Sequence, residues 1–350
     1  MAHQTSRFQP DRLRSEARAK VMVDRLMAVC LSGMLTSVVL AGEPNLSGPR
    51  EGFVFDSPTK SVRPILGMLG AAYLGTAVLN EIDAAWIAPG RQHGIVVQGD
   101  KVLLVSGLGS ERLDISTLPG SGKRPEGVAW SSDGSLAVLY SATGRWIQKF
   151  THVPDAPVSG QFTDFSVLAG ELSAFAVDAP GARIGFGIRG EVDGGVYMAV
   201  NDQFPRLLMT IAEPAAVAFG KSESLYVADR ATGQIFELQS SGLSASIIRA
   251  ENGAADFIAI RFGEDSRGRR LFYLVSRADQ TLRIYDASTY DLVNEIALEA
   301  QPTGMEPVGE SSLLLSGRVR SGDPLWLLSG KPSPVVYFVP GIGGGMEGQY

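Results

Sequence analysis

The stretch PEGVAWSSDGSLAVLYSATG at residues 125–144 recurs as PAAVAFGKSESLYVADRATG at residues 214–233. The two stretches align without a gap at an offset of 89 residues, and nine of their twenty positions are identical. Chance alone gives roughly one or two identities, because even a common residue makes up only about 7% of a chain. The offset is two periods of about 44 residues, and a repeat of about 40–45 residues in a β-rich chain indicates a β-propeller.

The sequence around this repeat divides into further units of similar length. Each unit holds four short apolar segments separated by turn residues, such as the Asp133-Gly134 pair that suits a tight hairpin. The segments are apolar on both faces, as in residues 136–140, which is typical of strands buried between neighbouring sheets. We therefore expect an all-β propeller over residues 52–340. Its six four-stranded repeats are expected at residues 81–119, 125–169, 171–211, 214–249, 257–298 and 302–339.

The segment before the first repeat leaves the number of blades open. Residues 53–56 and 61–66 are expected to form a hairpin around a Ser-Pro-Thr-Lys turn. Two arrangements accommodate the hairpin: six blades to which it is added for closure, or seven blades of which one is incomplete. A closed ring protects the edges of its sheets, so we expect the hairpin and the last strand, 335–339, to pair within one blade. We favour six blades, with seven as the alternative.

The repeat also resembles a known family. The stretch LYVADRATGQI at residues 225–235 resembles the NHL and YVTN-type propeller repeats, and so does SLAV at residues 135–138 followed by its Thr-Gly turn. WD40 repeats fit less well, because the chain has no Trp-Asp and no Gly-His pair. Kelch repeats fit less well because Gly-Gly turns do not recur at the repeat period. The resemblance implies a fold and leaves the activity open.

The first 42 residues indicate a targeting segment. Residues 1–25 carry six Lys/Arg and three Asp/Glu, and the uncharged run LMAVCLSGMLTSVVLAG follows at residues 26–42. This pattern is typical of a Sec-type signal peptide, with Met22 as an alternative start that gives a signal of ordinary size. An uncleaved membrane anchor stays open, since a 17-residue apolar run is at the lower limit for a spanning helix. Residues 43–51 are expected to be a linker and residues 341–350 a flexible tail.

Net charge and cysteine content limit which classes of partner and which cellular compartment we expect. The chain has a net charge of −6, and since residues 1–42 contribute +3, the remainder carries −9. Phosphate backbones require a basic face, so we expect no nucleic acid partner, and membrane contact only through an uncleaved signal. The only cysteine, Cys30, lies within the apolar run, so the exported domain has no thiol chemistry. We expect a periplasmic or extracellular protein of bacterial type.

Residues that carry catalysis or bind metals are sparse. After residue 42 the chain has two histidines, His93 and His152, which fall in different repeats and are expected to be exposed turn residues. A metal site needs several converging ligands, and a nucleophile needs a base within reach. The turn SGLGS at residues 106–110 has no following helix and therefore cannot form a phosphate loop. We expect no metal, no cofactor and no catalytic residue.

Four arginines occupy corresponding positions in successive repeats. Each lies within about two residues of the end of the second strand of repeats three to six, and the set is Arg189, Arg230, Arg277 and Arg318. Superposed repeats would place them in a partial ring on one rim, where guanidinium groups could bind carboxylate or phosphate. The alternative is that they solubilise the rim and pair with turn acids. Repeat two departs from the pattern, since Ser141 corresponds to Arg230.

These observations favour an exported propeller that acts as a non-catalytic binding or scaffold module for a protein or a small polar ligand. The alternative is a periplasmic hydrolase of lactonase or esterase type with its site at the channel mouth, because propellers resembling the YVTN group include such enzymes. The two hypotheses, a binding module and a hydrolase, require different residues at the channel. Only the hydrolase needs metal ligands or acid and base groups there.

Overall fold

The computed structural model of the chain describes residues 48–341, without residues 179, 193, 202, 221–223, 240–243, 250–255 and 310–311, and describes only the backbone of residues 244–249. All of these residues belong to one compact unit. The expected signal peptide, the first five residues of the expected linker and the expected tail beyond residue 341 lie outside the described residues. The expectations for these segments therefore stay predictions.

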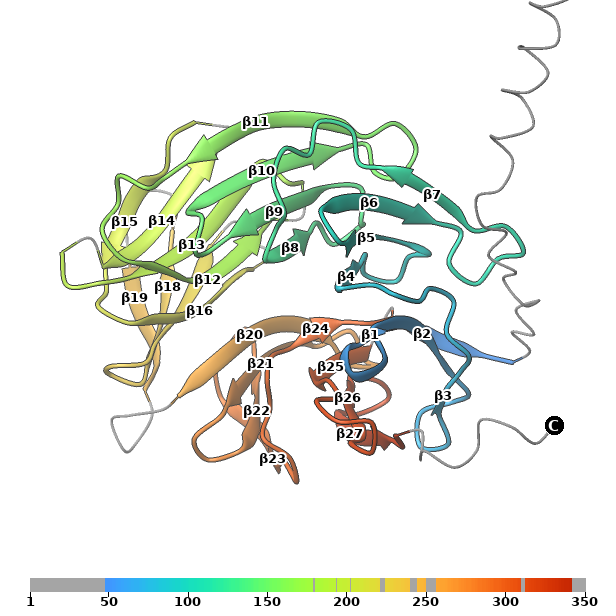
Figure 1. Ribbon diagram of the computed structural model, residues 1–350. Helices are drawn as coiled ribbons and strands as arrows, with labels where there is room; N and C mark the ends of the chain where they lie inside the picture. Colours follow the sequence, from blue (N-terminus) through green and yellow to red (C-terminus); the bar gives the residue numbers. More distant parts are fainter. Residues whose placement is uncertain are drawn as a thin grey trace, which may run out of the picture. The chain divides into compact units, whose positions relative to one another are not determined.

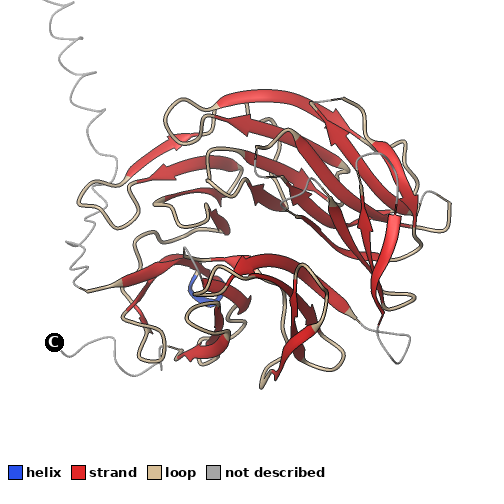
Figure 2. Cartoon of the chain, turned by 180° about the vertical axis from the view of Figure 1, so that it is seen from behind, coloured by secondary structure: helices blue, strands red, loops and turns tan. Residues whose placement is uncertain are grey.

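The described chain is almost entirely antiparallel strands, arranged as seven sheets that follow one another in chain order (Figures 1 and 2). We number the sheets as blades 1 to 7. Blade 1 has three strands and one 3-10 turn: β1 (Arg50–Asp56), η1 (Ser57–Thr59), β2 (Ser61–Leu66) and β3 (Tyr73–Leu74). Blade 2 comprises β4 (Ala84–Ile87), β5 (His93–Gln98), β6 (Lys101–Ser106) and β7 (Asp114–Thr117). Blade 3 comprises β8 (Gly127–Trp130), β9 (Ala137–Ser141), β10 (Trp146–Thr151) and β11 (Val158–Asp164).

The other four blades each have four strands. Blade 4 comprises β12 (Glu171–Val177), β13 (Arg183–Arg189), β14 (Gly195–Val200) and β15 (Arg206–Thr210). Blade 5 comprises β16 (Pro214–Phe219), β17 (Leu225–Asp229), β18 (Gln234–Leu238) and β19 (Ser244–Arg249). Blade 6 comprises β20 (Phe257–Glu264), β21 (Arg270–Ser276), β22 (Thr281–Asp286) and β23 (Leu292–Ala297). Blade 7 comprises β24 (Glu306–Pro307), β25 (Ser312–Ser316), β26 (Leu325–Ser329) and β27 (Val335–Val339).

The structure confirms the all-β propeller and its repeats. The six predicted repeats are blades 2 to 7, and the matching stretches 125–144 and 214–233 contain the first two strands of blades 3 and 5, with one blade between them. The number of blades is seven, the alternative to the favoured six. The expected pairing of the hairpin with strand 335–339 is wrong, because β1 and β2 form their own sheet with β3, and β27 pairs with β26.

One predicted strand is displaced for a physical reason. The sequence predicts the fourth strand of blade 3 at residues 163–168, whereas the strand lies at Val158–Asp164. The apolar stretch that follows it is a turn, in which the backbone N–H of Leu168 donates to the carbonyl of Phe165. The Phe165 side chain is fully buried between blades 3 and 4. The apolar residues at this position therefore belong to a turn whose side chains fill the core, and they do not form a strand.

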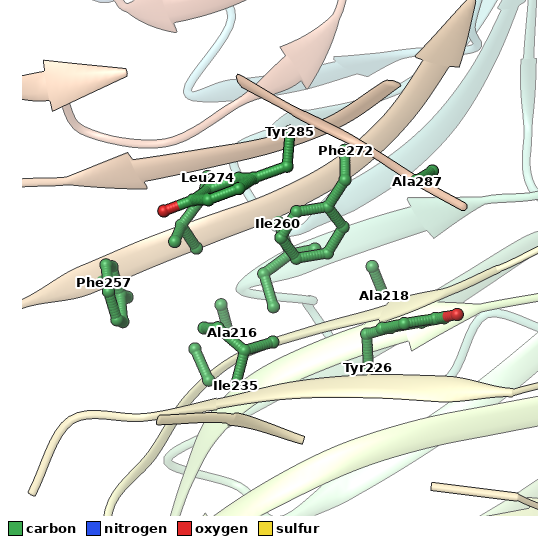
Figure 3. Close-up of a cluster of buried hydrophobic side chains, with 11 residues drawn as sticks. Ala216, Ala218, Tyr226, Ile235, Phe257, Ile260, Phe272, Leu274, Tyr285 and Ala287 are labelled. Atoms are coloured by element: carbon green, nitrogen blue, oxygen red, sulfur yellow. The ribbon is translucent and has the colours of Figure 1, made fainter. Parts of the chain in front are cut away.

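The core consists of layers between neighbouring blades. Between blades 5 and 6, Phe272 and Ile260 face Tyr226 and Ile235 (Figure 3). The ring of Phe272 lies 5.9 Å from that of Tyr226. The inner strands of the sheets, such as β17, are buried on both faces, whereas outermost strands such as β7 and β23 are largely exposed. Full burial of one apolar side chain stabilises the fold by about 1.5–3 kcal/mol. This explains why the inner strands are apolar on both faces.

Among the described residues, blade 1 has no counterpart of the innermost strand of the other blades. The turn between β1 and β2 contacts the segment that enters blade 2: Ile82 N–H donates to the carbonyl of Lys60, and Lys60 Nζ lies 3.3 Å from Asp83 Oδ1. Asp83 also accepts the backbone N–H of Gly99, in the turn between the second and third strands of blade 2. The β1–β2 turn is therefore equivalent to the second turn of a complete blade. It follows that β1, β2 and β3 occupy the second, third and fourth positions.

The ring closes by side-chain packing between blades 7 and 1. Val54 and Ile65 of blade 1 pack with Leu325, Leu327 and Val339 of blade 7 in one buried cluster. The blades share no strand among the described residues. Closure thus relies on hydrophobic burial and on the polar contacts described below, because no backbone hydrogen bond between described residues crosses this junction.

Candidate functional site in the channel

Because successive strands of a blade are antiparallel, their turns lie alternately on two opposite rims of the propeller. In blades 2 to 7 the first-turn rim carries the turns between the first and second strands and between the third and fourth strands. The opposite, second-turn rim carries the turns between the second and third strands and the connections between blades. The four predicted arginines all follow or end second strands, so they belong to the second-turn rim, as expected.

The structure pairs each of these arginines with an acid. Arg189 Nη2 lies 2.6 Å from Glu171 Oε2, within blade 4. Arg230 and Arg277 share one carboxylate, since their Nε atoms lie 2.8 Å and 3.8 Å from the two oxygens of Asp256. Only these two of the four are brought together.

Arg318 stands apart from the rest of the set because its side chain is buried. Its Nη1 donates to Asp56 Oδ2 across the junction of blades 7 and 1. Each of the four arginines therefore has an acidic partner among the described residues.

A cavity of about 560 Å³ opens at the other end of the channel, on the first-turn rim. Its walls come from blades 2 to 7 and combine apolar side chains with a few charged ones. The apolar part includes Trp130, Val177, Phe219, Phe262 and Leu313. The charged residues of the lining are Arg261, Glu264, Arg270 and Lys331. Concave, mostly apolar cavities of this size with a few convergent polar groups are the usual form of small-molecule sites.

Arg261, on the first strand of blade 6, extends into the channel. Its Nε–H donates to the carbonyl of Met305 at 3.0 Å, which leaves both terminal NH₂ groups without a partner among the described residues. The side chain is exposed to the lumen, yet the surrounding blades remove part of its hydration. This desolvation lowers the pKa of Arg261, while the nearby Glu306 and Tyr140 act in the opposite direction. Arg261 stays charged, because its ordinary pKa lies so far above neutrality.

Tyr273, on the second strand of blade 6, supplies a buried phenol to the same wall. The residue is 2% exposed, and its hydroxyl has no hydrogen-bond partner among the described residues. Burial raises the pKa of Tyr273 to about 12. Gly263, two residues beyond the strand partner of Tyr273, leaves room for the ring, because a Cβ there would lie 2.6 Å from Tyr273 Cε2. An unpartnered buried hydroxyl is destabilising, so its presence beside a cavity suggests a ligand that completes it.

Trp130 lines the cavity from blade 3, and its Nε1–H is likewise buried without a partner among the described residues. The indole packs edge-on against His93, with ring centroids 5.6 Å apart. His93 is buried and its Nε2 lies 2.9 Å from the carbonyl of Gly134. The expectation of an exposed turn histidine is therefore wrong for His93, which begins β5 and packs between blades 2 and 3. His152 is exposed, as expected.

Glu306 and Tyr140 place further polar groups near Arg261. Desolvation raises the pKa of Glu306, and the charge of Arg261 partly offsets this. Desolvation, followed by Glu306, raises the pKa of Tyr140. The ring of Tyr140 packs directly against Gly127. A Cβ at residue 127 would overlap this ring, so the close contact requires glycine. A polar group from blade 3 therefore interacts with a cation and an acid from blades 6 and 7.

The repeat pattern does not reveal these residues, although the sequence holds a signal for Arg261. Arg261 is the only charged residue in the run FIAIRF at 257–262, the first strand of its repeat. Innermost strands of a propeller line the channel, so a lone charge in one of them points into the lumen or is paired. Tyr273 and Trp130 gave no such signal, because aromatic residues in strands are ordinary core residues.

Comparison with protein-family models finds no match, and comparison with curated proteins finds none. Solved propeller structures do match. Dihydro-heme d1 dehydrogenase NirN in complex with DHE is 14% identical with a TM-score of 0.55, over 87% of this chain and 67% of that one. Virginiamycin B lyase from Staphylococcus aureus is 11% identical with a TM-score of 0.53, over 84% and 96%. Hsv2 of Kluyvelomyces marxianus is 10% identical with a TM-score of 0.53, over 83% and 97%. These likenesses show the propeller fold alone.

Among residues 48–341, outside the gaps given above, no group of three or more His, Cys, Asp or Glu side chains is arranged to hold a metal ion. The same residues include no helix with the length and hydropathy needed to cross a membrane.

Proposed function

We propose that this chain is a non-catalytic binding module that holds a small polar ligand in the cavity on its first-turn rim. The observation that carries the proposal is that Tyr273 lines the cavity and that its buried hydroxyl has no partner among the described residues. A buried hydroxyl without a hydrogen bond costs about 1–3 kcal/mol. A ligand that accepts or donates a hydrogen bond there would recover this free energy on binding.

The shape and lining of the cavity support the same proposal. Its volume, about 560 Å³, lies in the range that accommodates a drug-sized or metabolite-sized molecule. Apolar contacts with Phe219, Phe262 and Leu313 would supply non-directional affinity, and the polar groups would orient the ligand. The walls come from six blades, so the site is held by rigid strands and short turns.

A ligand screen with matched tyrosine variants tests the proposal. We expect thermal denaturation of the purified propeller to show stabilisation by a subset of small polar compounds, since a ligand that binds only the folded state raises its stability. Tyr273→Phe should weaken the response to the compounds that bind. Tyr285→Phe is the control, because Tyr285 is buried in the blade 5–6 core and does not line the cavity.

Two results would contradict the proposal. Equal responses of Tyr273→Phe and wild type to every binding compound would remove Tyr273 from the site. Conversion of a bound lactone or ester by the wild-type protein would favour the hydrolase alternative.

We also propose that the propeller acts after export, as a member of the NHL and YVTN-type group. The support is the basic and apolar pattern of residues 1–42 and the absence of cysteine after that segment. N-terminal sequencing of the protein recovered from a bacterial periplasmic fraction tests export: cleavage after residue 42 is expected, and full-length protein in the cytosolic fraction alone would contradict it.

A further inference from the structure

We infer that the ligand of this cavity carries an oxyanion, a carboxylate or a phosphate, on an apolar body, and that the oxyanion binds Arg261. The inference rests on the proposed function and assigns its ligand class. It follows from three properties of the site: the way Arg261 is held, the balance of donors and acceptors, and the volume left for the rest of the ligand.

The guanidinium of Arg261 is oriented before a ligand arrives. Its Nε–H is used by the Met305 carbonyl at 3.0 Å, so one edge of the group is tied to blade 7. The two terminal NH₂ groups remain, and they form a fork that matches the two oxygens of a carboxylate or of a phosphate. Because the side chain is already fixed, binding costs less conformational entropy than at a free surface arginine.

The other polar groups of the lining are mostly hydrogen-bond donors. Trp130 Nε1–H can only donate, and Tyr273 brings a phenol O–H. Both are buried without partners among the described residues. Arg270 and Lys331 add positive charge to the wall. The acid of the lining, Glu264, lies directly opposite Arg270 in the β20–β21 register. Glu306, the acid that interacts with Arg261, is not among the lining residues. In the lining itself donors outnumber acceptors, and a ligand rich in acceptors complements them.

The remainder of the cavity is apolar and larger than an oxyanion requires. The apolar lining residues include Ala176, Val177, Phe219, Phe262 and Leu313. A bare inorganic ion would leave these side chains in contact with water and would gain nothing from them. An aromatic or aliphatic body attached to the oxyanion would bury them, so the site fits an amphipathic anion better than an inorganic one.

Titration calorimetry with four probes tests the inference. The probes are 4-phenylbutyrate, phenyl phosphate, the neutral 4-phenylbutyramide and inorganic phosphate. We expect one or both aromatic anions to bind, and the amide and inorganic phosphate to bind at least about tenfold more weakly, because hydrogen bonds to a charged group contribute more than neutral ones. The stronger of the two aromatic anions identifies the preferred oxyanion.

Two charge-matched variants locate the interaction. Arg261→Gln should weaken the aromatic anion by about tenfold to a hundredfold, the range expected for charge-assisted hydrogen bonds. Arg91→Gln removes the same charge from an exposed arginine of the blade 2 first turn, outside the lining, and should change affinity by less than about twofold. Retention of the wild-type melting temperature shows that each variant is folded.

The possible failures are distinguishable. Equal binding of the amide and the carboxylate, or an unchanged affinity in Arg261→Gln, overturns the oxyanion inference while the binding function stands. Failure of all four probes overturns the inference for aromatic anions. If, in addition, the broader thermal screen finds no compound whose effect depends on Tyr273, the proposed function itself is contradicted.

Discussion

Arg318 and Asp56 lie 262 residues apart in the sequence, and their side chains join the last blade to the first, with Arg318 Nη1 donating to Asp56 Oδ2 at 3.1 Å. Both side chains are fully buried. Arg63 Nε lies 3.2 Å from the same oxygen, and Thr59 Oγ1 donates to it at 2.6 Å. One carboxylate therefore neutralises two guanidinium groups at the junction where no strand is shared.

Asp56→Ala is expected to reduce the free energy of unfolding by about 3–5 kcal/mol, because it leaves two buried cations without their counter-charge. Urea denaturation followed by tryptophan fluorescence measures the effect. Glu171→Ala is the control, since it breaks the more exposed pair with Arg189 and should cost no more than about 1 kcal/mol. Similar losses in the two variants would show that the Asp56 cluster does not hold the ring closed.

Glu306→Gln is expected to stabilise the protein at neutral pH. The folded protein holds the pKa of Glu306 above its ordinary value, so the native state binds the proton more tightly than the unfolded chain. The resulting destabilisation appears as pH rises through the ordinary glutamate pKa and persists above it. Arg261 from blade 6 and Tyr140 from blade 3 are the ionisable groups that interact with it. Because the side chain faces the lumen, the gain should stay below about 1 kcal/mol.

Melting temperatures of wild type and Glu306→Gln between pH 4 and 8 check this prediction. The two curves should converge at the acidic end and separate toward neutrality. A constant offset, or a variant less stable than wild type at pH 7, would mean that attraction to Arg261 outweighs desolvation.

His93 is expected to make the protein sensitive to acid. Desolvation lowers the pKa of His93 in the folded state, and the Gly134 carbonyl only partly offsets this. The unfolded chain therefore takes up the proton first, and stability is lost as pH falls below the ordinary histidine pKa of about 6.5. The slope is at most about 1.4 kcal/mol per pH unit for one group. His93→Gln should show a flatter dependence of the free energy of unfolding between pH 7 and 5, whereas His152→Gln, at an exposed site, should match wild type.

Gly127→Ala is expected to destabilise blade 3 by about 1–3 kcal/mol, the usual cost of overpacking. A methyl group there would overlap the ring of Tyr140, which stacks on Phe175 at 4.7 Å. The double variant Gly127→Ala/Tyr140→Leu should lose less than the sum of the two single variants. Gly122→Ala, at a glycine with nothing within 4 Å of its added Cβ, should be close to neutral. Strict additivity in the double variant would refute the overlap.

The repeat of residues 125–144 at 214–233 was enough to predict a propeller and the positions of most strands, because core strands and Gly-containing turns obey local rules. The same rules could not predict the number of blades. Whether the hairpin at 53–66 completes another blade or forms its own depends on contacts with residues more than 200 positions away. The rim arginines were found because they follow the repeat. Arg261, Tyr273 and Trp130 were missed because they come from different blades and do not.

The sequence by itself determined the repeated unit of this protein, which is four short strands that are apolar on both faces. Because several such units follow one another, a ring of blades is the arrangement that buries those faces. Only the tertiary structure decided how the ring closes and what it encloses. Closure depends on Asp56 meeting Arg318, and the cavity depends on Arg261 and Tyr273 of blade 6 coming into one lining with Trp130 of blade 3. Such contacts are set by the packing of whole blades. The sequence repeat does not predict them, because the residues that meet belong to different blades and do not occupy equivalent repeat positions.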